Sequence, residues 1–127
     1  MITIELPWPA KELSPNSRCH WREKAKATSL AKWEGRYVAM ELTDSIYFPT
    51  KWAMDGTPDG FIAQYIFHPP DKRKRDIDNC LAMMKAHQDG VFSAFDIDDY
   101  RIKRTVLEWG EVVKGGKVVL TLEELNG

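Results

Sequence analysis

The sequence predicts a mixed α/β (α+β) fold, with one sheet of four to five strands and two main helices, in a single domain spanning residues 1–127. Three observations lead to this prediction. Residues 2–6 alternate apolar and polar side chains, as a strand with one buried face does. Residues 20–42 repeat apolar side chains at steps of three and four, which is typical of a helix. Residues 112–119, with Gly115-Gly116 between valine-rich segments, predict a β-hairpin, because a two-residue Gly-Gly turn tolerates the positive φ angles that a hairpin needs.

The first half of the chain is predicted to contain a strand, a loop and a long helix. Pro7 and Pro9 end the strand at residues 2–6, since proline does not continue a ladder, and residues 10–17 have the composition of a loop. The helix over residues 20–42 carries one apolar stripe, formed by Ala27, Leu30, Trp33, Tyr37 and Met40.

The middle of the chain has no clear periodicity over residues 44–60, and we expect it to be mostly loop, with a short strand possible at 46–48. Residues 61–67 are apolar on both parities, which predicts a strand buried on both faces.

A second helix is predicted from residue 78 to about residue 94. A strand follows over residues 100–109 and a last strand over 118–122, on either side of the Gly-Gly turn. The predicted order is therefore β, α, a possible β, β, α, β, β.

Composition limits the function only loosely. The formal net charge is −1, which counts mildly against a nucleic-acid-binding protein. The signs are segregated along the chain, however, so a basic track beside an acidic site remains compatible with the total. Cys19 and Cys80 form no disulfide framework, and we expect reduced thiols in a cytoplasmic protein. No signal peptide or membrane-spanning run is recognised.

The most informative stretch is a run of four cations, Lys72 to Arg75, that leads into Asp76-Ile77-Asp78-Asn79. Cations suit phosphates, and clustered carboxylates suit a hard divalent metal ion. In an extended segment, residues two apart share a face, so Asp76 and Asp78 could approach one ion. A metal ion beside phosphate-binding cations is the minimal set for cutting a phosphodiester.

A second acidic cluster follows the predicted helix and contains Asp96, Asp98 and Asp99. These carboxylates repel one another unless a cation neutralises them. Lys85 lies on the same predicted helix face as Asp78, roughly 10 Å along the axis. Its side chain could therefore reach a phosphate or a leaving oxygen near the metal.

Each of these features also has a purely structural interpretation. Asp76 or Asp78 could serve as a helix N-cap, the acids near Asp98 could form a solvated turn, and Lys85 could face solvent. The cations in the first half of the long helix could be a solvated surface or a contact surface for a DNA backbone. His20, His68 and His87 show no ligand spacing, and we expect them to be structural or superficial, although His20 lies near a candidate contact loop.

Several segments, taken in order, resemble the RusA family of crossover junction endodeoxyribonucleases, the prophage-type Holliday junction resolvases. The resemblance covers nearly the whole chain. The segments that carry it are Leu6-Pro7-Trp8-Pro9, Leu13-Ser14-Pro15-Asn16-Ser17-Arg18, His20-Trp21, Arg75-Asp76-Ile77-Asp78-Asn79, Lys85 with Asp89-Gly90, Asp98-Asp99 and Lys114-Gly115-Gly116.

The resemblance implies a homodimer that binds branched DNA, specifically four-way junctions, and makes paired cuts in recombination and repair. The cofactor would be Mg²⁺ or Mn²⁺, held by Asp76, Asp78 and Asp99, with Asp98 as the alternative third ligand. The essential lysine of the family maps to Lys85, one helical turn beyond its usual place, which Ala82 occupies here. DNA contacts are expected from Asn16, Arg18 and His20, from Lys72, Arg73, Lys74 and Arg75, and from Arg101 and Lys103.

Two other functions stay open at this point. The chain could be a nuclease acting on other branched phage DNA. It could also be a catalytically inactive DNA-binding module in which the acidic residues only cap helices and form turns.

Overall fold

The computed structural model describes residues 1–43 and 60–125. The possible strand at 46–48 and nearly all of the predicted loop at 44–60 lie outside the described residues. Within those that are described, the chain forms one mixed four-stranded sheet and three α-helices, which confirms the predicted α/β class.

The sheet has the strand order β1-β4-β2-β3. Strands β1 (Ile2–Pro7) and β4 (Lys117–Leu125) are antiparallel, β4 and β2 (Gly60–His68) are antiparallel, and β2 and β3 (Ile102–Trp109) are parallel. Alternate residues of the two central strands point into the core. Fully buried core side chains on the strands include Ile4, Leu6, Phe61, Tyr65, Phe67, Val118, Leu120 and Leu122.

The Gly-Gly turn forms, but the predicted hairpin is wrong, because β3 and β4 both pair with β2 and not with each other. Gly115 and Gly116 have φ angles of 80° and 71°, and the Gly116 amide donates to the Val113 carbonyl at 2.8 Å. Residues 110–113 bond to the end of β2 instead of β4, through the Gly110 amide to Phe67 and the Val113 amide to Pro69. The chain thus crosses over β2 before β4 enters the sheet between β1 and β2.

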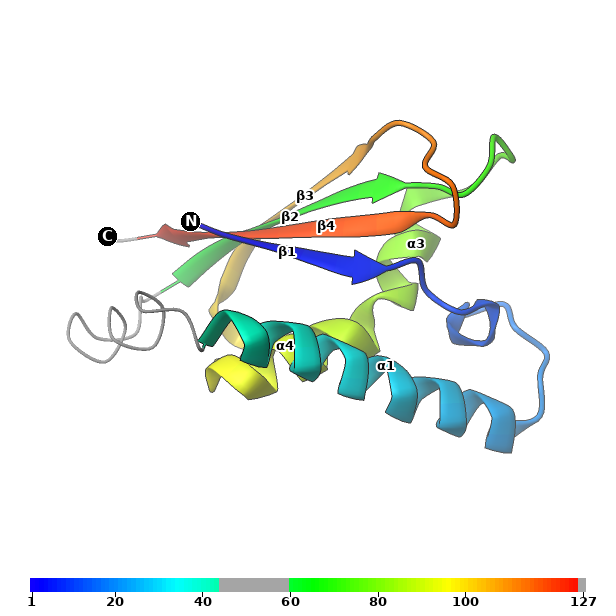
Figure 1. Ribbon diagram of the computed structural model, residues 1–127, viewed down its shortest axis with the longest axis horizontal. Helices are drawn as coiled ribbons and strands as arrows, with labels where there is room; N and C mark the ends of the chain where they lie inside the picture. The colour runs from blue at the N-terminus through cyan, green and yellow to red at the C-terminus, as the bar shows by residue number, and fades with distance from the viewer. Residues whose placement is uncertain (44–59, 126–127) are drawn as a thin grey trace.

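The helices α1 (Trp21–Thr43) and α4 (Lys85–Phe95) lie side by side against one face of the sheet, and α3 (Ile77–Met83) lies near the ends of β2 and β3 (Figure 1). The long helix was predicted within one residue at each end. No helix in residues 1–43 or 60–125 is both long and apolar enough to cross a membrane.

The second predicted helix is divided in two at Met84. The Met84 amide donates to the Leu81 carbonyl three residues back, at 3.0 Å, in place of the usual partner four residues back. The Met84 side chain is completely buried in the core. Because the chain turns here, Lys85 begins a new helix and no longer continues the face that carries Asp78. The sequence argument that placed the two residues on one face is therefore wrong.

The apolar stripe predicted along the first helix is on its solvent side, except for Ala27, which is half-buried. Leu30, Trp33, Tyr37 and Met40 keep between 48% and 60% of their surface exposed. The buried residues of α1 are small, Ala31, Gly35 and Ala39, and the larger Val38 and Leu42 are half-buried against the core. The packed face was hard to recognise from sequence because small side chains contribute little to an apolar pattern.

Two glycines set the distance between α1 and α4. A Cβ atom at Gly35 would lie 2.2 Å from the His87 carbonyl oxygen, and one at Gly90 would lie 2.0 Å from the Lys32 carbonyl oxygen. Since both obstacles are backbone atoms of packed helices, they have little freedom to move aside. The two backbones therefore approach as closely as they do only because both positions lack a side chain.

His87 is buried at this helix contact. Only 2% of its surface is exposed, and neither ring nitrogen has a hydrogen-bond partner among the described residues. Its Nε2 lies 3.9 Å from Glu34 Oε1, beyond hydrogen-bond distance. Burial lowers the pKa of His87 from 6.5 to about 4, so the ring is neutral at physiological pH.

We predict that Gly90→Ala lowers the free energy of unfolding by about 2 kcal/mol. Alanine gains up to about 1 kcal/mol in helix propensity, but the clash with the Lys32 carbonyl forces the helices apart at greater cost. Urea unfolding followed by circular dichroism measures the change. Ser29→Ala, on the exposed side of α1, is the control and should shift stability by less than about 0.5 kcal/mol. Equal stability of Gly90→Ala and wild type would contradict the close contact.

His87 should make the protein acid-labile over a defined interval. Because its folded pKa is lowered, its contribution is complete above pH 6.5 and is lost as pH falls from 6.5 towards 4, by up to about 3 kcal/mol. Glu34 would offset part of this loss by pairing with the protonated ring. Unfolding free energies of wild type and His87→Leu, compared at several pH values, give the contribution by difference. Parallel curves between pH 6.5 and 5 would show that the ring is not desolvated.

Candidate functional site

The predicted acidic pair lies at the start of α3. Asp76 occupies the N-cap position in extended conformation, and Asp78 lies in the first helical turn. Both carboxylates are exposed, while Ile77 between them is half-buried. No cap hydrogen bond from the Asp76 side chain is found among the described residues, so capping does not account for this carboxylate.

The Cys80 thiol responds to this pair. Burial raises its pKa, the Arg75 guanidinium lowers it, and the charges of Asp76 and Asp78 raise it further. Both carboxylates are thus close enough to act on the same buried group, one helical turn into α3. The thiol is buried and disfavoured as a thiolate, so it is a poor nucleophile.

Lys85 joins two acids from different parts of the chain. Its Nζ forms an ion pair with Asp89 Oδ1 at 2.9 Å, one turn along α4, and a close ion pair with Asp99 Oδ2. The hydrogen bond to Asp99 is the main reason why the pKa of Lys85 is raised, and Asp89 adds to it. Lys85 is therefore a fixed positive charge between two carboxylates.

Tyr65 and Gln88 form a hydrogen bond near this group, and neither residue was predicted from the sequence to belong to the site. The Tyr65 hydroxyl donates to Gln88 Oε1 at 2.5 Å. Burial raises the pKa of Tyr65, and the charges of Asp99 and Asp89 raise it further. Tyr65 lies on the same buried face of β2 as Phe61 and Phe67, so the pattern predicts a core residue and gives no sign that its hydroxyl reaches Gln88 of α4.

Asp99 begins the short 3-10 helix η2 (Asp99–Arg101), and Asp98 precedes it in extended conformation with an exposed side chain. The neighbouring cations, Arg101 and Lys103, lie over the Tyr100 ring at 5.6 and 5.7 Å. Two of the predicted DNA-contacting residues therefore flank the second acidic cluster directly.

The acids of the two groups do not form one cluster of three or more among the described residues. No set of three or more His, Cys, Asp or Glu side chains close enough to hold a metal ion occurs within residues 1–43 and 60–125. Asp99 is paired with Lys85, whereas Asp76 and Asp78 make no ion pair within the same ranges. The three-aspartate ligand set, with Asp98 as the alternative third ligand, stays a prediction. The chemistry of the donors suits Mg²⁺ or Mn²⁺, since exposed carboxylates are oxygen ligands.

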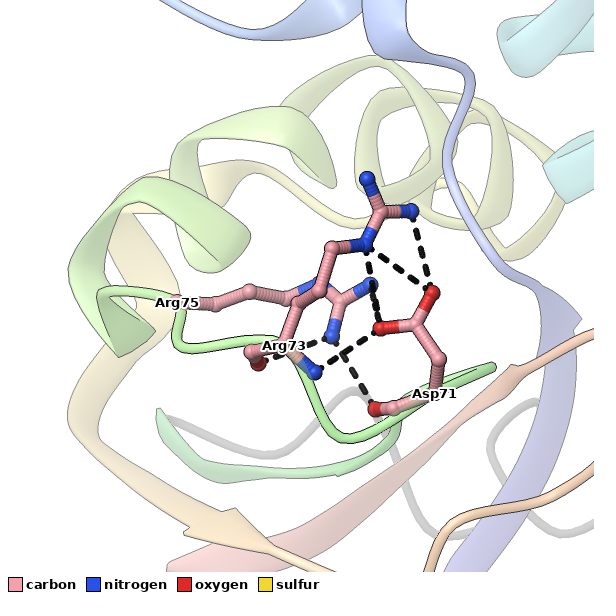
Figure 2. A network of polar contacts seen from close by, with 3 residues as sticks. All are labelled: Asp71, Arg73 and Arg75. Atoms are coloured by element: carbon pink, nitrogen blue, oxygen red, sulfur yellow. Dashed lines mark hydrogen bonds and ion pairs between the residues drawn. The ribbon is translucent and has the colours of Figure 1, made fainter.

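The basic loop before α3 is organised by Asp71 (Figure 2). Its carboxylate accepts hydrogen bonds from the Arg73 amide and guanidinium and from Arg75 Nη2 at 2.8 Å. Arg73 holds the pKa of Asp71 well below its usual range, with help from Arg75. Lys72 and Lys74 are exposed and form no ion pair within the described part of the chain.

Arg75 also connects this loop to the N-terminal segment. Its guanidinium lies 5.4 Å from the centre of the Trp8 ring, and only 17% of its side chain is exposed. A groove of about 470 Å³ lies here, lined by Trp8, Lys11, Arg73, Lys74 and Arg75 among others. Trp8 and Lys11 were not predicted to belong to a phosphate-binding surface.

The other predicted DNA-contacting residues lie just before α1. Asn16, Arg18 and His20 are exposed. His20 Nδ1 accepts a hydrogen bond from the Arg22 amide at 3.2 Å, and the His20 carbonyl accepts from Glu23 and Lys24. His20 is thus the residue that caps α1.

Fold and site together define a small mixed α/β protein with an exposed acidic pair beside a cationic loop. No protein-family model matches the chain. Over 123 residues, 96% of this chain and 76% of the relative, it is 37% identical to an uncharacterized protein of Xylella fastidiosa (strain Temecula1). The chain belongs to the same family as that protein.

Proposed function

We propose that this protein is a metal-dependent, structure-specific DNA endonuclease of the RusA type, which resolves four-way junctions by paired phosphodiester cuts. The observation that carries the proposal is the Arg75-Asp76-Ile77-Asp78-Asn79 segment. Its two carboxylates are exposed, are not used as a cap within the described residues, and directly follow a loop of four cations. That juxtaposition is what phosphodiester cleavage requires.

Asp76 and Asp78 would hold Mg²⁺ or Mn²⁺ together with Asp99 or Asp98. Such an ion supplies an activated water and charge stabilisation for the leaving oxygen. In this proposal, Lys85 holds Asp99 in place and presents a positive charge near the reacting phosphate. Its raised pKa favours the charged form, which suits an electrostatic role better than that of a general base.

DNA would contact the cations on both sides of the acids. Lys72 and Lys74 are the available charges of the basic loop, and Arg101 and Lys103 flank the second cluster. Binding through these groups would weaken steeply with salt. A two-fold homodimer would supply one site for each of the two strands that a junction presents. The cytoplasm is the compartment expected for such an enzyme.

One observation favours the alternative of an inactive DNA-binding module. Asp99 is already neutralised by Lys85, and a protein without a third carboxylate at the acidic pair would bind DNA without cutting it. A nuclease for other branched phage DNA would share the site and differ in substrate. Cleavage assays on four-way junctions, flaps and linear duplex with Mg²⁺ separate the three functions.

We predict that Asp78→Asn abolishes junction cleavage and leaves junction affinity unchanged or tighter, because the substitution removes a metal ligand and a charge that repels phosphate. Cleavage is measured on a labelled synthetic junction with Mg²⁺, and affinity by gel shift with Ca²⁺. Asp96→Asn, an equal charge change at an exposed acid, is the matched control and should cut normally. Parallel loss of binding and cleavage in Asp78→Asn would identify a structural residue.

Lys85→Ala should lower the single-turnover cleavage rate by at least about tenfold and change affinity far less. The loss of the ion pairs also frees Asp99, so circular dichroism is recorded to confirm folding. Lys85→Arg keeps the charge and should recover part of the rate. An unchanged rate in Lys85→Ala would remove this residue from the proposed reaction.

A further inference from the structure

A second, larger groove lies between the N-terminal loop and α1. Its volume is about 990 Å³, at the upper end of the roughly 300–1,000 Å³ found for ligand sites. Its apolar walls come from Trp8, Leu13, Ala27, Leu30 and Ala31. The 3-10 helix η1 (Lys11–Leu13) lines one side, and α1 lines the other with residues between positions 23 and 34.

The polar lining of this groove includes three carboxylates, the ammonium groups of Lys11 and Lys26, and one unpartnered ring. Glu12, Glu23 and Glu34 line it, and His87 lies beside Glu34. Only 2% of the His87 surface is exposed, and its two ring nitrogens have no hydrogen-bond partner within the described residues. A buried polar group without a partner is uncommon in native proteins, and here it borders a groove large enough to admit a ligand.

The large groove adjoins the basic one. Trp8 and Lys11 line both, and beyond them the basic groove continues to Arg73, Lys74 and Arg75. The two grooves differ in charge. The lining of the basic groove includes two guanidinium and two ammonium groups and no carboxylate, whereas the large groove has three carboxylates and two ammonium groups beside its apolar walls. A ligand that spans both therefore needs an anionic part and an apolar part with hydrogen-bond donors.

We infer that the two grooves together bind a single-stranded segment of DNA, with its phosphates in the basic groove and its unstacked bases in the apolar one. Trp8 lies where a base would pass from one to the other. The carboxylates would accept hydrogen bonds from the exocyclic amino groups of adenine, cytosine and guanine, whereas thymine can donate only its ring N3–H. This inference deepens the proposed function, because strands at a branch point can be unpaired.

The test is fluorescence anisotropy of labelled single strands of about 12 nucleotides, within the roughly 4–16 that such sites occupy. We expect oligo(dC) and oligo(dA) to bind more tightly than oligo(dT), and all to weaken with salt. Glu34→Gln should reduce the preference of dC over dT by up to roughly tenfold. Equal affinity of the wild type for the three strands would overturn the assignment of bases to the large groove.

Variants of the groove wall locate the binding. Lys26→Glu, at the rim, and Leu30→Asp, in the wall, should each weaken oligo(dC) binding by roughly tenfold or more. Lys32→Glu makes the same charge change on the same helix but lines neither groove, and it should change affinity little. Trp8→Ala removes the shared aromatic wall. Since Trp8 also packs edge-on against Phe67, the exposed Leu30 keeps the test valid if Trp8→Ala fails to fold.

Other results would refute the inference. An equal loss of oligo(dC) affinity in Lys26→Glu and Lys32→Glu would mean that overall charge, and not the groove, determines binding. A wild-type dimer that Leu30→Asp converts to monomer, without an effect on DNA, would mean that a second copy of this chain occupies the groove. Binding of oligo(dC) by a protein that never cuts junctions would refute the proposed function and leave this inference standing, whereas junction cleavage without groove-dependent strand binding would do the reverse.

Discussion

The close approach of α1 and α4 is the constraint on which the rest of the structure depends. Gly35 and Gly90 let each helix contact the backbone of the other. The pair then covers the sheet, where Phe92 and Val91 of α4 meet the aromatic row of β2 in one core. Because α4 is held so closely, its first residues, Lys85, His87, Gln88 and Asp89, have fixed positions at the helix contact and beside the acids.

Because of this packing, α4 presents some of its side chains to solvent and others to the buried side of the molecule. Lys85 and Asp89 face Asp99 in solvent, Gln88 bonds to the buried Tyr65, and His87 turns toward Glu34 of α1. The break at Met84 is what makes this arrangement possible. A continuous helix from Asp78 would have set Lys85 on the face of Asp78 instead.

The sequence predicted the mixed α/β class, the long helix and the strands, because their signals are local. Alternation along residues 2–6 and the glycines at 115 and 116 reflect pleat geometry and φ preference, which neighbouring residues alone determine. Crossing connections are not local. The position of β4 between β1 and β2 follows from long-range pairing. The Gly-Gly turn could therefore be predicted from the sequence, but the strands with which its neighbours pair could not.

The site divides in the same way. The sequence alone shows which residue types could act on a phosphodiester. It also shows that Asp76 and Asp78 stand beside four cations, since residues adjacent along the chain are near in space. Tertiary structure decided that Lys85 pairs with Asp99, that Trp8 and Lys11 join the basic loop, and that large apolar residues of α1 face solvent. The physical reason is that each depends on contacts between distant parts of the chain. The Lys85 pair depends on the helix break at Met84, and the orientation of α1 depends on backbone packing at glycine and alanine, which leave almost no hydrophobic pattern.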